Sequence, residues 1–355
     1  MYLNMDKRNF DLNRNSFDIL KYWAAFSVMF LHYTYYAFME AEQAWGFMDK
    51  LRKISEFFPG VIVLFTISGF LISDSMERSD SKVEFLKKRV LRLYPELWLC
   101  TIVNLVVLII IAREYLDGSI IVWLGTQIVG IANTPACLDG FSTGSVNGAL
   151  WTIFVEIQLY LLLCFGYNFV KKMRIFQWGI MLMGGIGVNL FCDYVSKKYG
   201  GILAKLIERS FFPYLIWFII GVFCFQYRDK IIQYLRYIVI PLLIVYWKIF
   251  PFVNQKPGYY TGITVSILCP FIVIGLAFLL PSIRLKRDLS YGIFLYHWIV
   301  LNFIVYFQLL SKWKWYLSFG FFILATLFLA WCSQLTVKKI MVKINKISKY
   351  KKYNG

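Results

Sequence analysis

Long apolar runs recur along the chain and are separated by short polar or basic segments. Each run is close to the length that crosses ~30 Å of hydrocarbon as a helix, about 18 residues or more. The predicted spans, the third of which opens at a proline, cover residues 17–37, 57–74, 95–112, 150–170, 175–192, 211–227, 236–250, 262–280, 289–310 and 316–336. This pattern predicts an all-α integral membrane protein, a bundle of about ten transmembrane helices.

A further apolar run at 119–132 is either an eleventh span or a re-entrant or interfacial segment. Basic residues favour the second interpretation, because cytoplasmic loops carry an excess of lysine and arginine. A full crossing there would place the basic segment 171–174 and the lysine-rich tail outside the cell. The sequence therefore predicts a cytoplasmic segment 1–16, a transmembrane domain 17–336 and a basic cytoplasmic tail 337–355, in the inner or plasma membrane of the cell.

Composition supports a membrane protein and excludes several other classes. The chain has 355 residues, of which 59% are hydrophobic and 16% charged, and its mean hydropathy is +0.60. The net charge of +18 lies mostly in the connections between spans, so anionic membrane lipids are the expected partners and nucleic acid is not. The seven cysteines are scattered singly, which argues against a disulfide or metal framework.

The first span carries polar residues on one face. At 100° per residue, Asp18, Lys21, Ala25 and His32 fall within an arc of roughly 60°. An ionisable side chain within a span costs roughly 2.5 kcal/mol or more at the bilayer centre, so it usually faces the protein interior and marks function. The alternative is a Lys21 that snorkels to the interface and a His32 that is only structural.

A basic cluster precedes the third span. Arg89 and Arg92 are three residues apart, so on a helix they share a face and could clamp one anion, with Lys88 beside them. Anchoring by positive charge on the inner side is the alternative. Ser68 stands in a Ser-Gly pair of the second span, where small residues also allow close helix packing.

Thr152, Glu156 and Tyr160 are spaced by four and share one face of the fourth span. Counted from the outer surface, Glu156 lies roughly 9 Å deep and His32 roughly 8 Å, so the two could form an orienting pair or a proton relay. A structural role for the buried Glu156 is the alternative. His297 is the second of the chain's two histidines, and by the same count it lies nearer to mid-membrane than His32. Both a role in the site and a structural role stay open for it.

Five stretches, in this order, resemble the motifs of the membrane-bound acyltransferase family 3, of the type that O-acetylates cell-surface polysaccharides. They are FDILKYWAAFSVMFLH (17–32), GVIVLFTISGFLIS (60–73), FLKKRVLRLYPELW (85–98), NGALWTIFVEIQLY (147–160) and LSYGIFLYH (289–297). Lys21 departs from the family pattern, which normally has arginine there. Lysine keeps the charge but lacks the planar two-pronged donor of arginine.

The resemblance implies a membrane O-acyltransferase that moves an acetyl or other short acyl group, such as succinyl, from cytoplasmic acyl-CoA to a hydroxyl of a surface polysaccharide or its lipid-linked precursor. Lipopolysaccharide and exopolysaccharide are such acceptors, acetyl-CoA is the expected co-substrate, and no metal is implied. Alternatives are a transporter or exporter of glycan or acyl intermediates, and a non-catalytic scaffold of a polysaccharide assembly complex. Homo-oligomers or assembly partners stay open.

The resemblance also implies roles for individual residues. His32 is the expected base or a transient acyl carrier, and Glu156 its orienting partner. The residues expected to bind substrates are Lys21, Lys88, Arg89, Arg92, Ser68, Tyr160 and His297.

Overall fold

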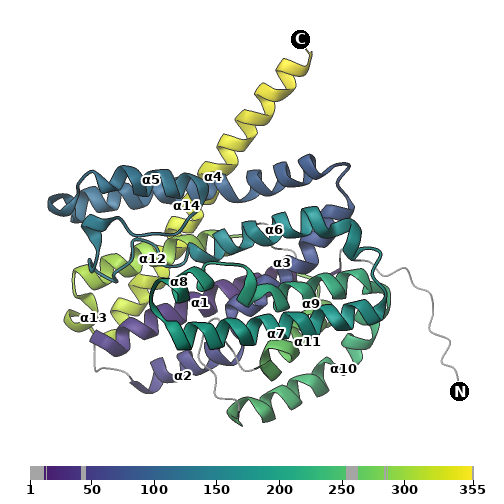
Figure 1. Ribbon diagram of the computed structural model, residues 1–355. Coiled ribbons are helices and arrows are strands. Elements are labelled where there is room, and N and C mark those ends of the chain that lie inside the picture. The colour runs from purple at the N-terminus through teal and green to yellow at the C-terminus, as the bar shows by residue number, and fades with distance from the viewer. Residues whose placement is uncertain are drawn as a thin grey trace, which may run out of the picture.

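The computed structural model describes residues 12, 14–40, 45–252, 263–283, 285 and 287–353. Every regular element in these ranges is helical, as the apolar pattern predicts (Figure 1). The α-helices are α1 (Phe17–Glu40), α2 (Trp45–Phe57), α3 (Gly60–Glu77), α4 (Lys82–Ile111), α5 (Ser119–Val129), α6 (Trp151–Val170), α7 (Ile175–Tyr199), α8 (Gly201–Glu208), α9 (Leu215–Gln226), α10 (Arg228–Ile249), α11 (Ile263–Leu279), α12 (Ser290–Tyr306), α13 (Leu309–Lys312) and α14 (Trp315–Tyr353). Four 3-10 turns join them: η1 (Arg113–Tyr115), η2 (Ala136–Leu138), η3 (Phe212–Tyr214) and η4 (Phe250–Phe252).

The number of helices that are able to cross a membrane is smaller than predicted. Among the described residues, six helices are long and apolar enough, and the bent pair of α8 and Phe212–Gln226 gives a seventh. Each predicted span coincides with a helix, but the count of about ten is wrong by this measure. α11 and α12 are not counted because they have only 17 residues each. α1 is not counted either, because its lysine, histidine and tyrosine side chains lower its mean hydropathy. The chain is thus an all-α, multi-pass membrane protein.

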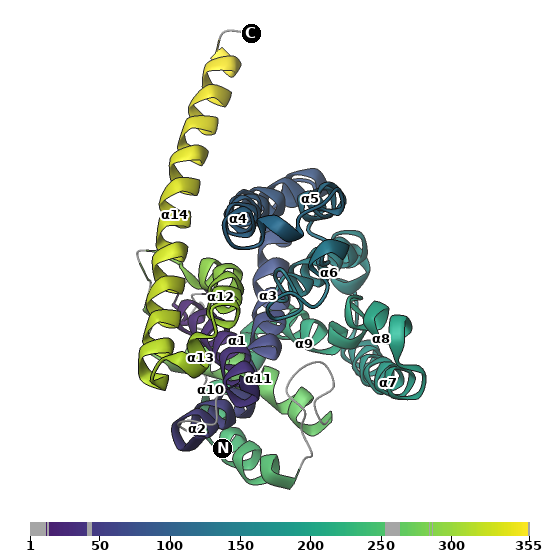
Figure 2. The ribbon, with the colours of Figure 1, turned by 90° about the vertical axis from the view of Figure 1, so that its left-hand side faces the viewer.

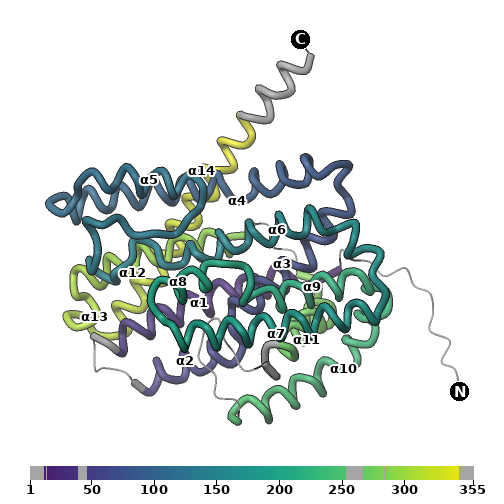
Figure 3. The backbone as a smooth tube through the Cα atoms, viewed as in Figure 1, coloured from purple at the N-terminus to yellow at the C-terminus, as the bar shows by residue number. Residues whose placement is uncertain are grey.

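The run at 119–132 forms α5, a helix of 11 residues. A span needs about 20 residues, so α5 is too short to cross. It lies beside α4 (Figure 3), and two aromatic side chains of α4 donate hydrogen bonds to its C-terminal carbonyls, Tyr94 to Val129 (3.0 Å) and Trp98 to Ile128 (3.1 Å). These bonds satisfy carbonyls that have no partner within α5.

The third predicted span begins earlier than Pro95, so the prediction that this proline opens a helix is wrong. α4 starts at Lys82, where the Ser81 side chain accepts a hydrogen bond from the Glu84 amide at 3.1 Å, a typical N-cap. The helix then continues through Pro95, which membrane helices tolerate when neighbours satisfy the freed carbonyl. As a result the basic cluster before Pro95 is helical and has a fixed direction.

α3 lies inside the bundle, between α1, α6, α9 and α11 (Figure 2). Where α3 crosses α9, the two backbones lie so close that Gly69 and Gly221 have no room for a side chain. A Cβ at Gly69 would lie 2.2 Å from the carbonyl oxygen of Phe218, and one at Gly221 would lie 2.2 Å from that of Thr66. The Ser-Gly pair therefore allows close helix packing, as one of the two interpretations of the sequence held.

The outer helices expose large apolar side chains, as a lipid-facing surface requires. Phe176 on α7, Ile121 on α5 and Ile202 on α8 are each about three-quarters exposed or more. α14 packs along α12 and continues past the rest of the bundle (Figure 2).

We expect Gly69→Val to destabilise the protein by about 1–3 kcal/mol or more, because the added side chain meets backbone atoms that are unable to move aside. Gly187→Val on α7 is the control, since nothing lies within 4 Å of its added Cβ. Thermal unfolding of the two purified variants in detergent compares them. Equal midpoints would show that the α3–α9 crossing tolerates a larger separation.

Candidate functional site

Two cavities lie next to each other inside the bundle. The first, here named the Glu156 cavity, has a volume of about 80 Å³, and the second, named the His32 cavity, about 610 Å³. Val61, Thr152 and Phe294 line both, so they form the wall between them. The predicted site residues divide between these two spaces.

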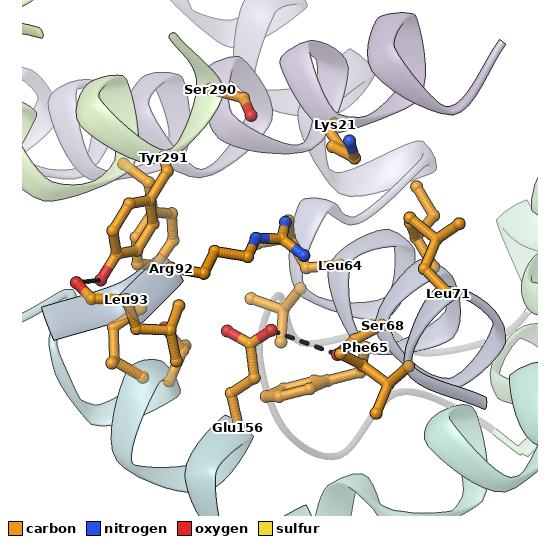
Figure 4. Close-up of a pocket in the computed structure, with 16 residues that line it drawn as sticks. Lys21, Leu64, Phe65, Ser68, Leu71, Arg92, Leu93, Glu156, Ser290 and Tyr291 are labelled. Atoms are coloured by element: carbon orange, nitrogen blue, oxygen red, sulfur yellow. Dashed lines mark hydrogen bonds between the residues drawn. The ribbon is translucent and has the colours of Figure 1, made fainter. Parts of the chain in front are cut away.

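Polar side chains from five helices meet at the Glu156 cavity (Figure 4). Lys21 comes from α1, Ser68 from α3, Arg92 from α4 and Glu156 from α6, with Ser290 at the start of α12. The rest of the lining is mainly apolar. A few convergent polar groups in apolar walls are typical of a substrate site.

Glu156 is held by its neighbours on both sides. Tyr160, one turn along α6, donates a hydrogen bond to Oε1, and the Ser68 hydroxyl donates to the same oxygen at 3.2 Å. Tyr160 is only 2% exposed. Ser68 and Tyr160 therefore determine the orientation of the Glu156 carboxylate.

Arg92 is the one member of the predicted basic cluster that enters the cavity. Its guanidinium points toward the space between Lys21, Ser68 and Glu156 (Figure 4). Among the described residues none forms a hydrogen bond or ion pair with it, although Glu156 and Asp288 lie close enough to attract its charge. A guanidinium without a fixed partner, in a cavity, is available to bind an anion.

The other two members of the cluster lie outside this cavity. Arg89 donates a hydrogen bond to the Ser75 hydroxyl at 3.0 Å, two turns along α3 from Ser68. Lys88 is exposed and pairs with Glu84 at 2.7 Å. Of the three, only Arg92 therefore lines the Glu156 cavity, and the cluster extends from there along α4. The clamp of one anion by Arg89 and Arg92 stays a prediction.

Lys21 lies between two carboxylates. Its ammonium is 3.0 Å from Asp18 and 3.4 Å from Asp288, and Ser290 donates to Asp288 at 2.5 Å. Burial by itself would raise the pKa of Asp288, but Lys21 and the hydrogen bonds from Ser290 outweigh it, so the pKa lies below its usual range. Sequence reasoning missed Asp288, although it directly precedes the LSYGIFLYH motif.

His32 opens onto the second cavity and is hydrogen-bonded to His297. The His32 Nδ1 lies 2.8 Å from the His297 Nε2, with the ring planes 9° apart. This separation is shorter than stacked faces permit, so the rings meet edge to edge. On its other side, the His297 Nδ1 faces the carbonyl oxygen of Ile293 at 3.2 Å.

These contacts assign the tautomers of both neutral rings. A carbonyl accepts only, so the proton of His297 is on Nδ1 and its Nε2 carries a lone pair. That lone pair accepts from the His32 Nδ1–H, which leaves the His32 Nε2 unprotonated. Among the described residues this nitrogen has no hydrogen-bond partner, and it is placed to act as a base.

His32 and Glu156 line different cavities, and the structure shows no hydrogen bond between them. Glu156 is bound by Ser68 and Tyr160 instead, and His32 by His297. A proton relay between His32 and Glu156 stays a prediction. Conversely, His297 contacts His32 although its counted depth differed, since α1 and α12 cross there.

Trp298 of α12 packs edge-on against His32, with ring centroids 4.6 Å apart. The loop between η2 and α6 holds the Trp298 side chain by hydrogen bonds. The Trp298 Nε1 donates to the Thr143 hydroxyl at 3.0 Å and is also 3.1 Å from the Ser145 carbonyl oxygen. Gly148 is required in this loop, because a Cβ there would lie 2.4 Å from the Trp298 ring. The contacts that support His32 thus join parts of the chain that are far apart in sequence, and the sequence analysis did not predict them.

One family of proteins and two individual proteins are similar in sequence to this chain. A sequence model of the acyltransferase 3 family, described as an acyltransferase domain, matches residues 14–335. Nodulation protein 10 of Rhizobium leguminosarum bv. viciae is 26% identical over 334 residues, 85% of this chain and 86% of that protein. The O-acetyl transferase of Shigella phage Sf6 is 24% identical over 291 residues, 79% of this chain and 83% of its own. No solved structure matches the chain.

We expect Lys21→Met to lower the free energy of unfolding by about 1–3 kcal/mol, because it leaves Asp18 and Asp288 close together without a cation. Lys53→Met is the matched control: Lys53 is 67% exposed and pairs with Asp49 on the surface of α2. Such a pair contributes about 0–1 kcal/mol. Thermal unfolding in detergent tests the difference, and equal losses would contradict a structural role for Lys21.

Proposed function

Since this chain belongs to the acyltransferase 3 family and is an acyltransferase of the membrane, we propose that it moves an acetyl or other short acyl group from acyl-CoA to a hydroxyl of a surface polysaccharide or its lipid-linked precursor. The observation that carries this proposal is the chain of hydrogen bonds from Ile293 through His297 to His32. It leaves one basic nitrogen beside a cavity, as transfer to a hydroxyl requires. The relative named as an O-acetyl transferase supports the acetyl group.

The Glu156 cavity suits the reactive end of the donor. Its volume of about 80 Å³ is too small for a whole coenzyme A, since drug-sized ligands need about 300 Å³ or more. In the proposed complex, acetyl-CoA inserts only its thioester arm and leaves the nucleotide outside. Arg92 then meets a phosphate or the thioester oxygen, and Arg89 and Lys88, further out along α4, face the nucleotide phosphates.

The His32 cavity holds the acceptor in this proposal. The His32 Nε2 removes the proton of the acceptor hydroxyl while the hydroxyl oxygen attacks the thioester carbonyl carbon. The tetrahedral intermediate carries the negative charge on the former carbonyl oxygen and then expels the thiolate of coenzyme A. That thiolate takes the proton back from His32, so the cycle ends with an ester, a free thiol and a neutral imidazole.

His297 and Glu156 are positioning residues in this scheme. His297 is fully buried, so it acts through His32 by accepting its Nδ1–H and thereby keeping the lone pair on Nε2. Glu156 lies on the other side of the wall, where its charge attracts the Arg92 guanidinium. We propose that it orients this guanidinium toward the donor.

We propose further that the protein lies in the inner or plasma membrane with both termini in the cytoplasm. The basic segments between spans and the lysine-rich tail support this orientation. The donor would then approach from the cytoplasm along α4, and the acceptor from the opposite side. A transporter of glycan intermediates is the rival class, because buried lysine, histidine and glutamate also build proton pathways.

We expect His32→Ala to lower acyl transfer at least 100-fold without lowering the amount of protein in the membrane, since general bases contribute factors of this size. Transfer of radiolabelled acetyl from acetyl-CoA to glycan, in membranes with matched expression, is the measurement. Full activity of this variant would refute the proposed base, and the absence of label with the wild-type chain and abundant glycan would favour the transporter.

The same measurement separates two variants of His297. We expect His297→Leu to lose about 10–100-fold, because His32 no longer has an acceptor for its Nδ1–H. His297→Gln keeps an amide oxygen that accepts a hydrogen bond, so it retains more activity than His297→Leu. Equal activities of the two variants would mean that His297 only fills space.

For the donor site, we expect Arg92→Ala to raise the KM for acetyl-CoA about 10-fold or more, the effect of losing one charge-assisted hydrogen bond. Arg78→Ala is the control, since Arg78 is 71% exposed and pairs with Asp74 at the end of α3. Initial rates at varied acetyl-CoA concentration test both. An unchanged KM for Arg92→Ala would exclude Arg92 from donor binding.

A further inference from the structure

The His32 cavity contains two charged side chains that the chemistry of acyl transfer does not use. Arg52 and Glu56, one turn apart on α2, line this cavity together with His32. The Arg52 guanidinium is 2.8 Å from Glu56 and 2.9 Å from Asp49. Surface pairs of this spacing contribute about 0.3–0.5 kcal/mol, which alone gives no reason to place them in the wall of a reaction cavity.

The cavity is much larger than a short acyl group needs. Its volume of about 610 Å³ is in the range that accommodates a drug-sized molecule. Its walls combine aromatic rings, contributed by Tyr35, Phe38 and Trp151, with the Arg52–Glu56 pair. Aromatic faces pack against the apolar faces of sugar rings, while a carboxylate and a guanidinium bind hydroxyl groups in fixed directions.

The backbone around Glu56 is tied to α1, the helix that carries His32. The Ser27 hydroxyl donates to the Ser55 carbonyl at 3.1 Å, and the Trp23 Nε1 donates to the Phe58 carbonyl at 2.9 Å. Glu56 itself is 16% exposed. A carboxylate fixed in this way can select one orientation of a bound molecule without reorganisation.

We propose that Arg52 and Glu56 form an acceptor-recognition subsite for a neutral, hydroxyl-rich sugar ring. This inference rests on the proposed acyl transfer and specifies where its acceptor binds. One sugar hydroxyl donates to the Glu56 carboxylate and another accepts from Arg52, while the ring lies against the aromatic wall and directs a third hydroxyl to the His32 Nε2. The subsite thus determines which hydroxyl is acylated.

The charges of α2 favour a neutral acceptor over an acidic one. Asp49 and Glu56 balance Arg52 and Lys53, which is 2.6 Å from Asp49. Lys50, the remaining cation of α2, does not line the cavity. Arg52 is therefore already neutralised, and an acidic sugar would meet the Glu56 carboxylate without an uncompensated cation.

The test compares the dependence of acyl transfer on its two substrates. The acceptor is the glycolipid fraction extracted from cells in which the wild-type chain acetylates glycan, and the donor is radiolabelled acetyl-CoA. We expect Glu56→Gln and Arg52→Gln to raise the apparent KM for this acceptor at least tenfold and to leave the KM for acetyl-CoA within twofold of wild type. Thermal unfolding confirms that both variants are folded.

Asp193→Asn is the matched control, because Asp193 pairs with Lys197 at the same spacing on α7, away from both cavities. Unchanged acceptor KM in folded Glu56→Gln and Arg52→Gln would overturn the subsite while leaving acyl transfer intact. An equal rise in both KM values would also overturn it, since the residues would then act on the whole site. No transfer by the wild-type chain would refute the proposed function, and the subsite with it.

Discussion

Helix α3 can lie inside the bundle only because glycines let three backbones touch. Gly69 and Gly221 bring α3 against α9, and a Cβ at Gly60 would lie 2.3 Å from the Ala24 carbonyl oxygen of α1. These contacts leave α3 no freedom to shift. Ser68, next to Gly69, is therefore held where it donates to Glu156, and the N-terminal turns of α3 supply wall to both cavities.

Polar groups inside an apolar bundle must find partners in the protein, because lipid offers none. The structure meets this requirement locally: two carboxylates flank Lys21, and Tyr160 and Ser68 bind Glu156. The Arg92 guanidinium and the His32 Nε2 have no partner among the described residues, and each belongs to a residue that lines a cavity. In the proposed reaction these are the groups that contact the substrates.

The separation into two cavities suits an enzyme whose substrates come from opposite sides of a membrane. The wall that Val61, Thr152 and Phe294 form is thin, because each of these residues lines both spaces. In the proposed reaction only the thioester carbonyl has to pass this wall to reach His32.

The sequence alone determined where the long apolar helices lie and which of their residues are polar, since hydrophobic periodicity acts over a few turns. It also singled out His32, Glu156 and His297. Only the tertiary structure decided which of these meet, because pairing depends on how helices cross and not on depth counted along one of them. Thus His297, not Glu156, contacts His32, and Asp288 joins Lys21 across most of the chain length. The directions of helix crossings are set by packing between segments far apart in sequence, which a local pattern does not contain.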